Sequence, residues 1–460
     1  MADAYRMEHD SMGEMRVPAE AMYGASTARA VENFPVSGIR FPREFIRALG
    51  RIKHAAAEVN HQLGRLDGAR AELIDRAARE VAVGDWDAHF PLDIFQTGSG
   101  TSTNMNANEV IAHRCKQLNA SIEVHPNDHV NMGQSSNDVI PTAIHVAAAD
   151  QLMHVLLPAL EQLHASLRRQ QEALAEVVKI GRTHLMDATP LTLGQEVSGW
   201  ARQVALGMDR LRACLPRLCE LAQGGTAVGT GLNTHPEFGR RMAEILSREY
   251  GIPFCEAENH FEAQAAQDAI VEFSGALRCL AVSLIKIAND VRLLNMGPRC
   301  GLAEISVPAV QPGSSIMPGK VNPVIAESLA QVCAQVIGND ATIAFAGASG
   351  MLELNVMLPV MAHNVLQSER LLANAARMFA EKCIDGLQAN ESKCAEQVEW
   401  SMSMVTALAP VIGYERAADL AKRAYREGKT VRELCLAQGV LPAEELERLL
   451  DPRSMLAPRD

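Results

Sequence analysis

The residues best suited to chemistry lie in one eleven-residue stretch, residues 313–323, which reads Gly-Ser-Ser-Ile-Met-Pro-Gly-Lys-Val-Asn-Pro. Its two glycines can adopt backbone conformations that other residues avoid, so main-chain N–H groups can converge on a small anion. Lys320 adds a positive charge, and Asn322 adds an amide that can donate to a carboxylate. Pro323 favours the first turn of a following helix, whose N-terminus also attracts negative charge. The stretch predicts an anion-binding loop, although a solvated surface loop could have the same composition.

Three further polar segments could take part in the same chemistry. They are Gly98–Asn106, Gln134–Asp138 and Gly181–Pro190, each with several hydroxyl or amide side chains. Such groups bind a carboxylate without holding it as tightly as an arginine fork does. The first segment can also be interpreted as an ordinary loop that caps a helix.

The four segments together resemble the fumarase/aspartase superfamily, whose members add water or an amine to fumarate or eliminate it. The superfamily pattern Gly-Ser-Ser-x-Met-Pro-x-Lys-x-Asn-Pro is filled without a gap, and the resemblance runs from about Asp10 to the C-terminus. His184 and Gly319 are similar to class II fumarases, since aspartases typically carry Gln and Ala there. The resemblance implies reversible hydration of fumarate to (S)-malate, a step of the tricarboxylic acid cycle.

This reaction, in the direction of dehydration, removes a proton from the carbon beside a carboxylate and expels hydroxide from the next carbon. It requires a base, a proton donor, and hydrogen-bond donors aimed at the enediolate. By residue type alone, His184 would be the base, because histidine titrates near neutrality. Glu327 could orient its imidazole. A structural histidine and a favourable acid near a helix N-terminus are the alternatives.

The resemblance assigns the catalytic roles differently. It implies that Ser314 abstracts the proton and that His184 with Glu327 handles the water. A serine hydroxyl is a poor base, so loop N–H groups and Lys320 would have to stabilise its alkoxide. The same resemblance implies that the substrate carboxylates are bound by Thr101, Ser135, Ser136, Asn137, Thr183, Ser315, Lys320 and Asn322, with Ser99 beside them.

A second anion-binding segment of the family is similar to His125-Pro126-Asn127-Asp128. The candidate ligands are His125, Asn127 and Asp128. The family often has basic residues just upstream, whereas this chain has Ile122 and Glu123. A structural turn and a weak ligand site both remain open here.

Long helical patterns should position these segments. Apolar residues recur three and four apart over 142–178, 191–222, 261–296 and 324–347, with Pro158 interrupting the first. Helices of this length span about 50 Å at 1.5 Å per residue. They predict a mainly α fold with a central long-helix bundle, and the resemblance implies a three-domain fumarase/aspartase-like fold. We expect domains over residues 1–135, 136–390 and 391–460.

The order of the helices predicts a site shared between chains. Residues 135–137 lie at the start of the first long helix, and His184 precedes the second. Successive long helices joined by a short connection run antiparallel, so their starting ends lie about 50 Å apart. One chain cannot bring both to a four-carbon substrate. We therefore expect active sites formed between subunits, and the resemblance implies a homotetramer.

The composition argues against several classes of partner and cofactor. The net charge of −12 argues against nucleic acid or an anionic membrane as a partner. Ten cysteines are scattered without a C-x-x-C or another spacing typical of zinc or iron–sulfur sites, so we expect no metal and no cofactor. Residues 1–10 lack the apolar core of a signal peptide, and no membrane span is expected. These features predict a cytoplasmic protein, and the resemblance implies an enzyme whose partners are fumarate and L-malate. Aspartate ammonia-lyase activity, or a catalytically silent structural relative, is the alternative.

Overall fold

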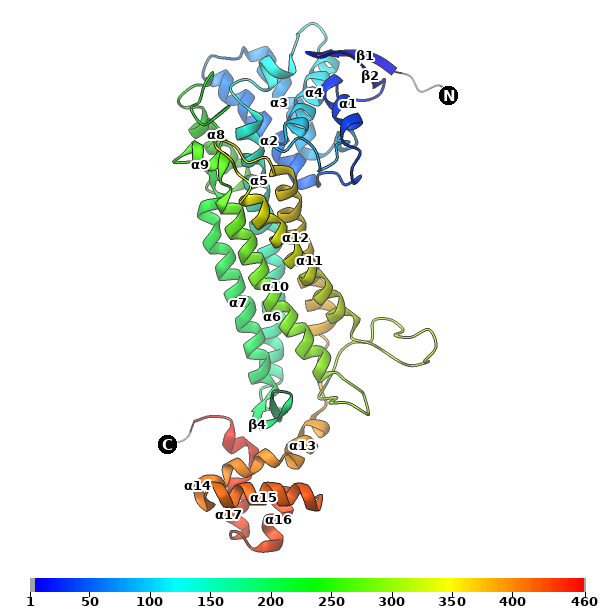
Figure 1. Ribbon diagram of the computed structural model, residues 1–460, viewed down its shortest axis with the longest axis vertical. Coiled ribbons are helices and arrows are strands. Elements are labelled where there is room, and N and C mark those ends of the chain that lie inside the picture. Colours follow the sequence, from blue (N-terminus) through cyan, green and yellow to red (C-terminus); the bar gives the residue numbers. More distant parts are fainter. Residues whose placement is uncertain (1–4, 459–460) are drawn as a thin grey trace. The chain divides into compact units, whose positions relative to one another are not determined.

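The computed structural model describes residues 5–458 and is mainly helical, which confirms the predicted α class (Figure 1). Contacts divide the chain into two compact units. The first comprises residues 5–158, Gly207–Ala281 and Ala334–Ala373, and the second comprises Ala159–Leu206, Val282–Cys333 and residues 374–458. The predicted boundaries near residues 135 and 390 stay a prediction.

The first unit is built around helix α2, Arg43–Gln62, which packs against α3, α5 and α8. Its buried face carries Phe45, Leu49 and Ile52 at helical spacing, and all three side chains are fully buried. The other elements of this unit are β1 (Tyr5–Asp10), β2 (Gly13–Pro18), α1 (Ala25–Asn33), α3 (Gly68–Val83), η1 (Asp87–His89), α4 (Thr101–Leu118), η2 (Pro126–Val130), α5 (Ser136–Gln151), η3 (Leu152–Leu156), β5 (Glu220–Leu221), α8 (Phe238–Tyr250), β6 (Cys255–Glu256) and α9 (His260–Ala265).

The second unit contains a β-hairpin and a group of short helices with a core of their own. Ile180 of the hairpin is buried in that core with Val398 and Leu434. The elements are β3 (Val178–Thr183), β4 (Met186–Thr192), β7 (Ile305–Ser306), η4 (Ala380–Ile384), β8 (Gln388–Ala389), α13 (Glu391–Trp400), η5 (Met402–Ala407), α14 (Ala409–Ile412), α15 (Tyr414–Glu427), α16 (Val431–Gln438), α17 (Ala443–Leu449) and η6 (Pro452–Met455).

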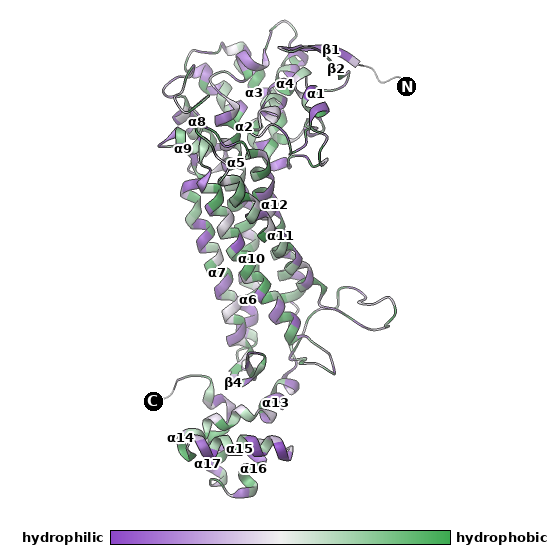
Figure 2. Cartoon of the chain, viewed as in Figure 1, coloured by the Kyte–Doolittle hydropathy of each residue, from purple (hydrophilic) through white to green (hydrophobic). Residues whose placement is uncertain are grey.

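Five long helices contribute residues to both units, and apolar residues recur along them (Figure 2). They are α6 (Leu157–Ala173), α7 (Leu193–Leu218), α10 (Asp268–Leu294), α11 (Val324–Gly347) and α12 (Leu358–Phe379). Within the first unit, Ser274 of α10 donates to Asp340 of α11 at 2.7 Å. Asn339 of α11 donates to Ser368 of α12 at 3.0 Å. Within the second unit, Trp200 of α7 donates to Asp290 of α10 at 2.9 Å. These bonds confirm the helical bundle.

Three of the predicted long helices have bounds that differ from the expected ones. The first long helix begins at Ser136 and ends at Ala173, with a π-helical turn, η3, just before Pro158. Proline lacks an N–H and its ring clashes with the preceding turn, which a wider π turn accommodates. The pattern over 261–296 is broken between α9 and α10, where Gln267 has φ +64°. Residues 178–192 form a hairpin, so the helix expected over 191–222 begins at Leu193 and ends at Leu218 as α7.

The helical run Ser136–Ala173 is the candidate membrane span that length and composition single out in residues 5–458. Most of its apolar window, 78%, is buried inside the protein. The core helix of a water-soluble protein has the same properties, so the run is weak support for a membrane span.

Candidate functional site

The loop before α11 is closed on itself by two hydrogen bonds. The N–H of Gly313 donates to the carbonyl of Lys320 at 2.8 Å, and Nδ2 of Asn322 donates to the carbonyl of Gly313 at 2.7 Å. A Cβ at Gly313 would lie only 2.6 Å from the Lys320 oxygen, so this close approach requires glycine. Gly319 has φ +83°, in the left-handed region. Gly313 is therefore required for the close approach of the loop ends, and Gly319 for the left-handed backbone conformation.

Ser314 lies in this closed loop with its hydroxyl oxygen facing backbone donors. Its Oγ accepts hydrogen bonds from the N–H groups of Met317 at 3.0 Å and Ile316 at 3.3 Å. Both donors would stabilise negative charge on that oxygen. Ser315 and Lys320 are exposed, and Lys320 forms no ion pair with any residue in the described part of the chain. The loop thus offers a free cation next to a serine with oriented donors.

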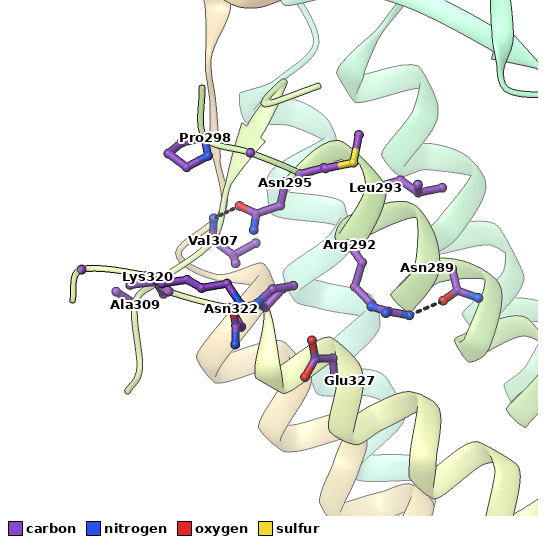
Figure 3. A pocket seen from close by; sticks show the side chains of 15 residues that line it. Asn289, Arg292, Leu293, Asn295, Pro298, Val307, Ala309, Lys320, Asn322 and Glu327 are labelled. Atoms are coloured by element: carbon purple, nitrogen blue, oxygen red, sulfur yellow. Dashed lines mark hydrogen bonds between the residues drawn. The ribbon is translucent and has the colours of Figure 1, made fainter. Parts of the chain in front are cut away.

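A pocket of about 830 Å³ opens beside the loop (Figure 3). Lys320, Asn322 and Glu327 line it, so three predicted site residues come together here. Glu327 lies in the first turn of α11, where the helix dipole favours a negative charge. All of the lining residues belong to the second unit.

The pocket is also lined by a cation that was not predicted from the sequence, Arg292 of α10. Its Nη1 donates to Oδ1 of Asn289 at 3.0 Å, and Figure 3 shows its side chain on the same side of the pocket as Glu327. Asn295 also lines the pocket and accepts from the N–H of Val307 at 3.1 Å. Because α10 also carries Asp268, Glu272, Arg278, Lys286 and Asp290, its sequence did not single out Arg292.

His184 lies at the tip of the β3–β4 hairpin. Thr183 pairs with Met186, so His184 and Leu185 form a two-residue turn with φ +55° and +61°. Such turns favour Asn-Gly, because other residues are strained in the left-handed region. Thr183 and His184 are both exposed. Strain of this kind often marks functional positions, and it supports interest in His184.

A network of buried charged side chains anchors the β3–β4 hairpin. Glu304 is fully buried, and its Oε1 accepts from Nη1 of Arg182 at 2.8 Å. Its other oxygen lies 3.2 Å from the ammonium of Lys179, which also pairs with Glu196 at 2.9 Å. Arg182 precedes Thr183, so this network fixes the strand that carries the predicted site residues.

The two members of the predicted imidazole–carboxylate pair are not joined in this chain. No hydrogen bond or ion pair connects His184 with Glu327 within residues 5–458, and His184 does not line the pocket that contains Glu327. The other predicted site residues fall into the two units as follows. Ser99, Thr101, Ser135, Ser136 and Asn137 belong to the first, and Thr183, Ser314, Ser315, Lys320 and Asn322 belong to the second.

The site residues of the first unit lie at the starts of α4 and α5. The hydroxyls of Ser99 and Thr101 are 2.7 Å apart. Ser135 caps α5, and its Oγ accepts from the N–H of Asn137 at 3.2 Å. Nδ2 of Asn104 in α4 donates to Oγ of Ser136 at 3.1 Å, which brings the two helix starts together.

The glycine-rich segment 223–233 packs against the start of α5. Nδ2 of Asn137 donates to the carbonyl of Ala227 at 2.8 Å. Asp138 is fully buried, and its Oδ2 accepts from the N–H groups of Gly224 at 3.2 Å and Thr226 at 2.9 Å. Burial raises the pKa of Asp138 to about 6, against the lowering effect of these donors. The segment therefore supports the predicted substrate-binding helix start.

The His125 segment forms the π-helical turn η2, Pro126–Val130. Nδ1 of His125 accepts from the N–H groups of Asn127 and Asp128, both at 3.2 Å. Arg70 of α3 donates to the carbonyl of Glu123 at 2.8 Å, so a cation lies near the segment although none precedes it in sequence. The ring nitrogen is already used as a helix cap, which favours the structural turn.

Over residues 5–458, no group of three or more His, Cys, Asp or Glu side chains is placed to hold a metal ion.

Comparison with known proteins adds an independent finding. The family model described as "Lyase" matches residues 13–338, and the one described as "Fumarase C C-terminus" matches residues 404–457. The chain is 57% identical to "Fumarate hydratase class II" of Corynebacterium glutamicum, covering 98% of this chain and 95% of that protein. It is 58% identical to the protein of the same name from Halobacterium salinarum, covering 99% and 98%.

A solved structure agrees with these relatives. The crystal structure of recombinant class II fumarase from Schistosoma mansoni superposes with a TM-score of 0.95 at 41% identity, covering 99% of this chain and 100% of that one. The sequence identity and the structural similarity both extend over nearly the whole length of the chain. The chain belongs to the class II fumarate hydratase family.

Proposed function

We propose that this protein is a fumarate hydratase that interconverts fumarate and (S)-malate by acid–base catalysis. The observation that carries the proposal is the closed loop in which Ser314 Oγ receives two backbone N–H groups beside the cationic pocket of Lys320. A dianionic substrate requires positive charge, and the whole chain carries a net charge of −12. The cations must therefore be local, as Lys320 is.

In the direction of dehydration, Ser314 as alkoxide takes the proton from the carbon next to one carboxylate. The electron pair of that C–H bond moves into the carboxylate and forms an enediolate, which Lys320 and Asn322 stabilise. The electrons then return to form the double bond as the C–O bond of the next carbon breaks. His184 gives the leaving hydroxide a proton and so releases water, while Glu327 stabilises the charged imidazole.

The remaining site residues bind the carboxylates. Ser135, Ser136 and Asn137 offer hydroxyl and amide donors at the N-terminus of α5, where the helix dipole adds attraction for an anion. Thr101 and Ser99 do the same at the start of α4. Thr183 and Ser315 complete the set from the second unit. Neutral donors allow the product to leave.

The protein acts as a homotetramer with active sites shared between subunits. Within residues 5–458, His184 and Glu327 share no hydrogen bond or ion pair, although the mechanism requires them to act on the same water. The predicted antiparallel course of successive long helices likewise separates Asn137 from His184 by about 50 Å within one chain. Residues from different subunits can meet only if a closed oligomer brings them together.

The reaction needs no metal, no cofactor, no nucleic acid and no membrane, and the enzyme works in the cytoplasm in the tricarboxylic acid cycle. The acidic net charge supports the absence of nucleic acid and anionic lipid partners. A weak anion site at His125, Asn127 and Asp128 would take no part in this reaction. The backbone N–H groups of Asn127 and Asp128 already donate to Nδ1 of His125, which leaves fewer donors for an anion.

One assay tests the activity. The ultraviolet absorbance of fumarate should fall after addition of the purified protein in buffer without ammonia, and it should rise from L-malate. A requirement for ammonia would indicate an aspartate ammonia-lyase instead. No change with either substrate would contradict the proposed function.

A further inference from the structure

The core of the first unit contains a lysine that the proposed reaction does not use. Lys53 of α2 is fully buried, and burial lowers its pKa to about 7. Within the described residues its ammonium contacts no carboxylate. It donates to Oδ1 of Asn131 at 2.9 Å and to Oε1 of Gln134 at 3.0 Å. Burying an ammonium group costs free energy that an apolar side chain would not. We therefore expect the hydrogen bonds of Lys53 to serve a function.

Both amides that Lys53 contacts lie in the turn just before the start of α5. Nδ2 of Asn131 donates to the carbonyl of Gln134 at 3.1 Å, which is the peptide joined to Ser135. Nε2 of Gln134 donates to the carbonyls of Val130 at 3.1 Å and Met132 at 3.2 Å. The lysine therefore holds the turn that leads directly into the predicted substrate-binding residues.

Lys53 also determines which way these amides face. A lysine ammonium has only donors, so Asn131 and Gln134 must present their oxygens to it. Oδ1 of Asn131 accepts two further hydrogen bonds, from Nδ2 of Asn104 at 3.2 Å and Nδ2 of Asn108 at 3.3 Å. A flipped Asn131 amide would instead place its NH₂ group against three donors.

The orientation extends to Ser136. Nδ2 of Asn104 has two hydrogens, of which one is donated to Asn131 and the other to Oγ of Ser136 at 3.1 Å. Because Oγ of Ser136 accepts from the protein interior, its own hydroxyl hydrogen is free to point away from it. Oδ1 of Asn104 is buried and has no partner in the described part of the chain, so the NH₂ group takes both bonds.

We propose that Lys53 is a positioning residue for substrate binding: through Asn131 and Asn104 it orients Ser136 to donate its hydroxyl hydrogen to a substrate carboxylate. This inference rests on the proposed hydration of fumarate. Lys53 itself touches no substrate and acts through Ser136. Without it, the amides can flip, and Ser136 can donate inward to an amide oxygen instead of outward to the carboxylate.

The test compares Lys53→Met, Asn104→Ala and Ser136→Ala, each alone, and the double variant Lys53→Met/Ser136→Ala. The carboxylate held by Ser136 is bound in the ground state and the transition state alike, so the expected effect is on KM. Each single variant should raise KM for fumarate and L-malate about tenfold, the loss expected for one well-placed hydrogen bond, with kcat within about threefold. The double variant should have the KM of Ser136→Ala, because the two act in series.

Val59→Ala is the matched control. Val59 lies on the same helix and is fully buried, but it forms no part of the amide network. It should lower stability and leave KM unchanged. If Lys53→Met fails to assemble, Asn104→Ala carries the test, since it interrupts the same chain of hydrogen bonds and keeps the lysine.

Different outcomes would overturn the positioning role and the proposed function. A wild-type enzyme that hydrates fumarate, with KM unchanged in both Lys53→Met and Asn104→Ala, would exclude the positioning role and leave the proposed function standing. Additive KM effects in the double variant would also exclude it. A wild-type protein that does not turn over fumarate would overturn the function, and this inference with it.

Discussion

The hydroxyl oxygen of Ser314 lies 3.0 Å from the backbone nitrogen of Met317, which donates a hydrogen bond to it. A serine hydroxyl becomes a base only as an alkoxide, and an N–H group already in place lowers the cost of that charge. The loop is closed around this contact by Gly313 and Asn322, so the donor is fixed before substrate arrives.

Ser314→Ala should lower kcat by at least about a hundredfold, the scale expected for a positioned base. The fold should be unchanged, because the loop closes through Gly313, Lys320 and Asn322 and not through the serine side chain. Ser349→Ala is a suitable control, since Ser349 also bonds to backbone but lies outside the site. Near wild-type turnover of Ser314→Ala in the fumarate assay would remove Ser314 from the mechanism.

His184→Asn should lower kcat by a similar factor while the protein becomes no less stable. Asparagine tolerates the left-handed conformation that His184 adopts at φ +55°, so the turn should be less strained in the variant. Thermal unfolding and the fumarate assay measure the two effects separately. His164→Asn on α6 controls for loss of a histidine. A large loss of stability in His184→Asn would show that the imidazole is structural.

Two inactive variants should complement each other if the sites are shared. Asn137→Ala and His184→Asn, unfolded together in equal amounts and refolded, should regain activity at about one quarter of the sites, because each site draws the two groups from different subunits. Each variant refolded alone is the control. Recovery of the oligomer without activity above those controls would contradict sites that combine Asn137 and His184 from different chains.

Activity should survive chelation. Side chains and backbone N–H groups can provide every donor and base in the proposed reaction, so prolonged dialysis against EDTA should leave kcat unchanged. The dialysed enzyme is compared with a portion to which Mg²⁺, Mn²⁺ or Zn²⁺ has been returned. Loss of turnover that a divalent metal restores would show that a metal takes part.

Lys53 should give stability a defined pH dependence. Burial lowers its folded pKa to about 7 from the ordinary lysine value of 10.5, and the nearby charge of Asp138 opposes that shift. Between these two values the unfolded state binds more protons, so the contribution of Lys53 to the free energy of unfolding should rise with pH from about 7 to about 10.5. Below pH 7 the full penalty of the buried charge remains.

The measurement compares wild type with Lys53→Met at one protein concentration, so that other titrating groups and assembly cancel. The variant should have its greatest advantage in the free energy of unfolding near pH 6, and that advantage should shrink towards pH 10. A difference that does not change with pH would mean that Lys53 keeps its proton throughout the range.

Local sequence determined much of the helical framework and predicted a candidate site. The pattern after Pro323 predicted a helix over 324–347, and α11 has those bounds, because proline at the start and helical spacing of apolar residues act within one segment. The loop motif contains Lys320 and Asn322, and Glu327 follows in the first turn of the predicted helix; all three line one pocket. Their roles in catalysis remain predictions.

Tertiary structure decided what depends on partners distant in sequence. Residues 178–183 form a strand because Ile180 is buried with residues of α13 and α16, and because Arg182 meets Glu304, 122 positions away. The helix expected over 191–222 begins only at Leu193, because residues 191 and 192 still pair with β3 and strand pairing outweighs local propensity there. The buried Lys53 is a similar case: its two amide partners lie 78 and 81 residues further along the chain, and no local pattern could pair them. Burial strengthens such polar contacts and penalises their absence, so the folded core selects the partners that the sequence alone leaves open.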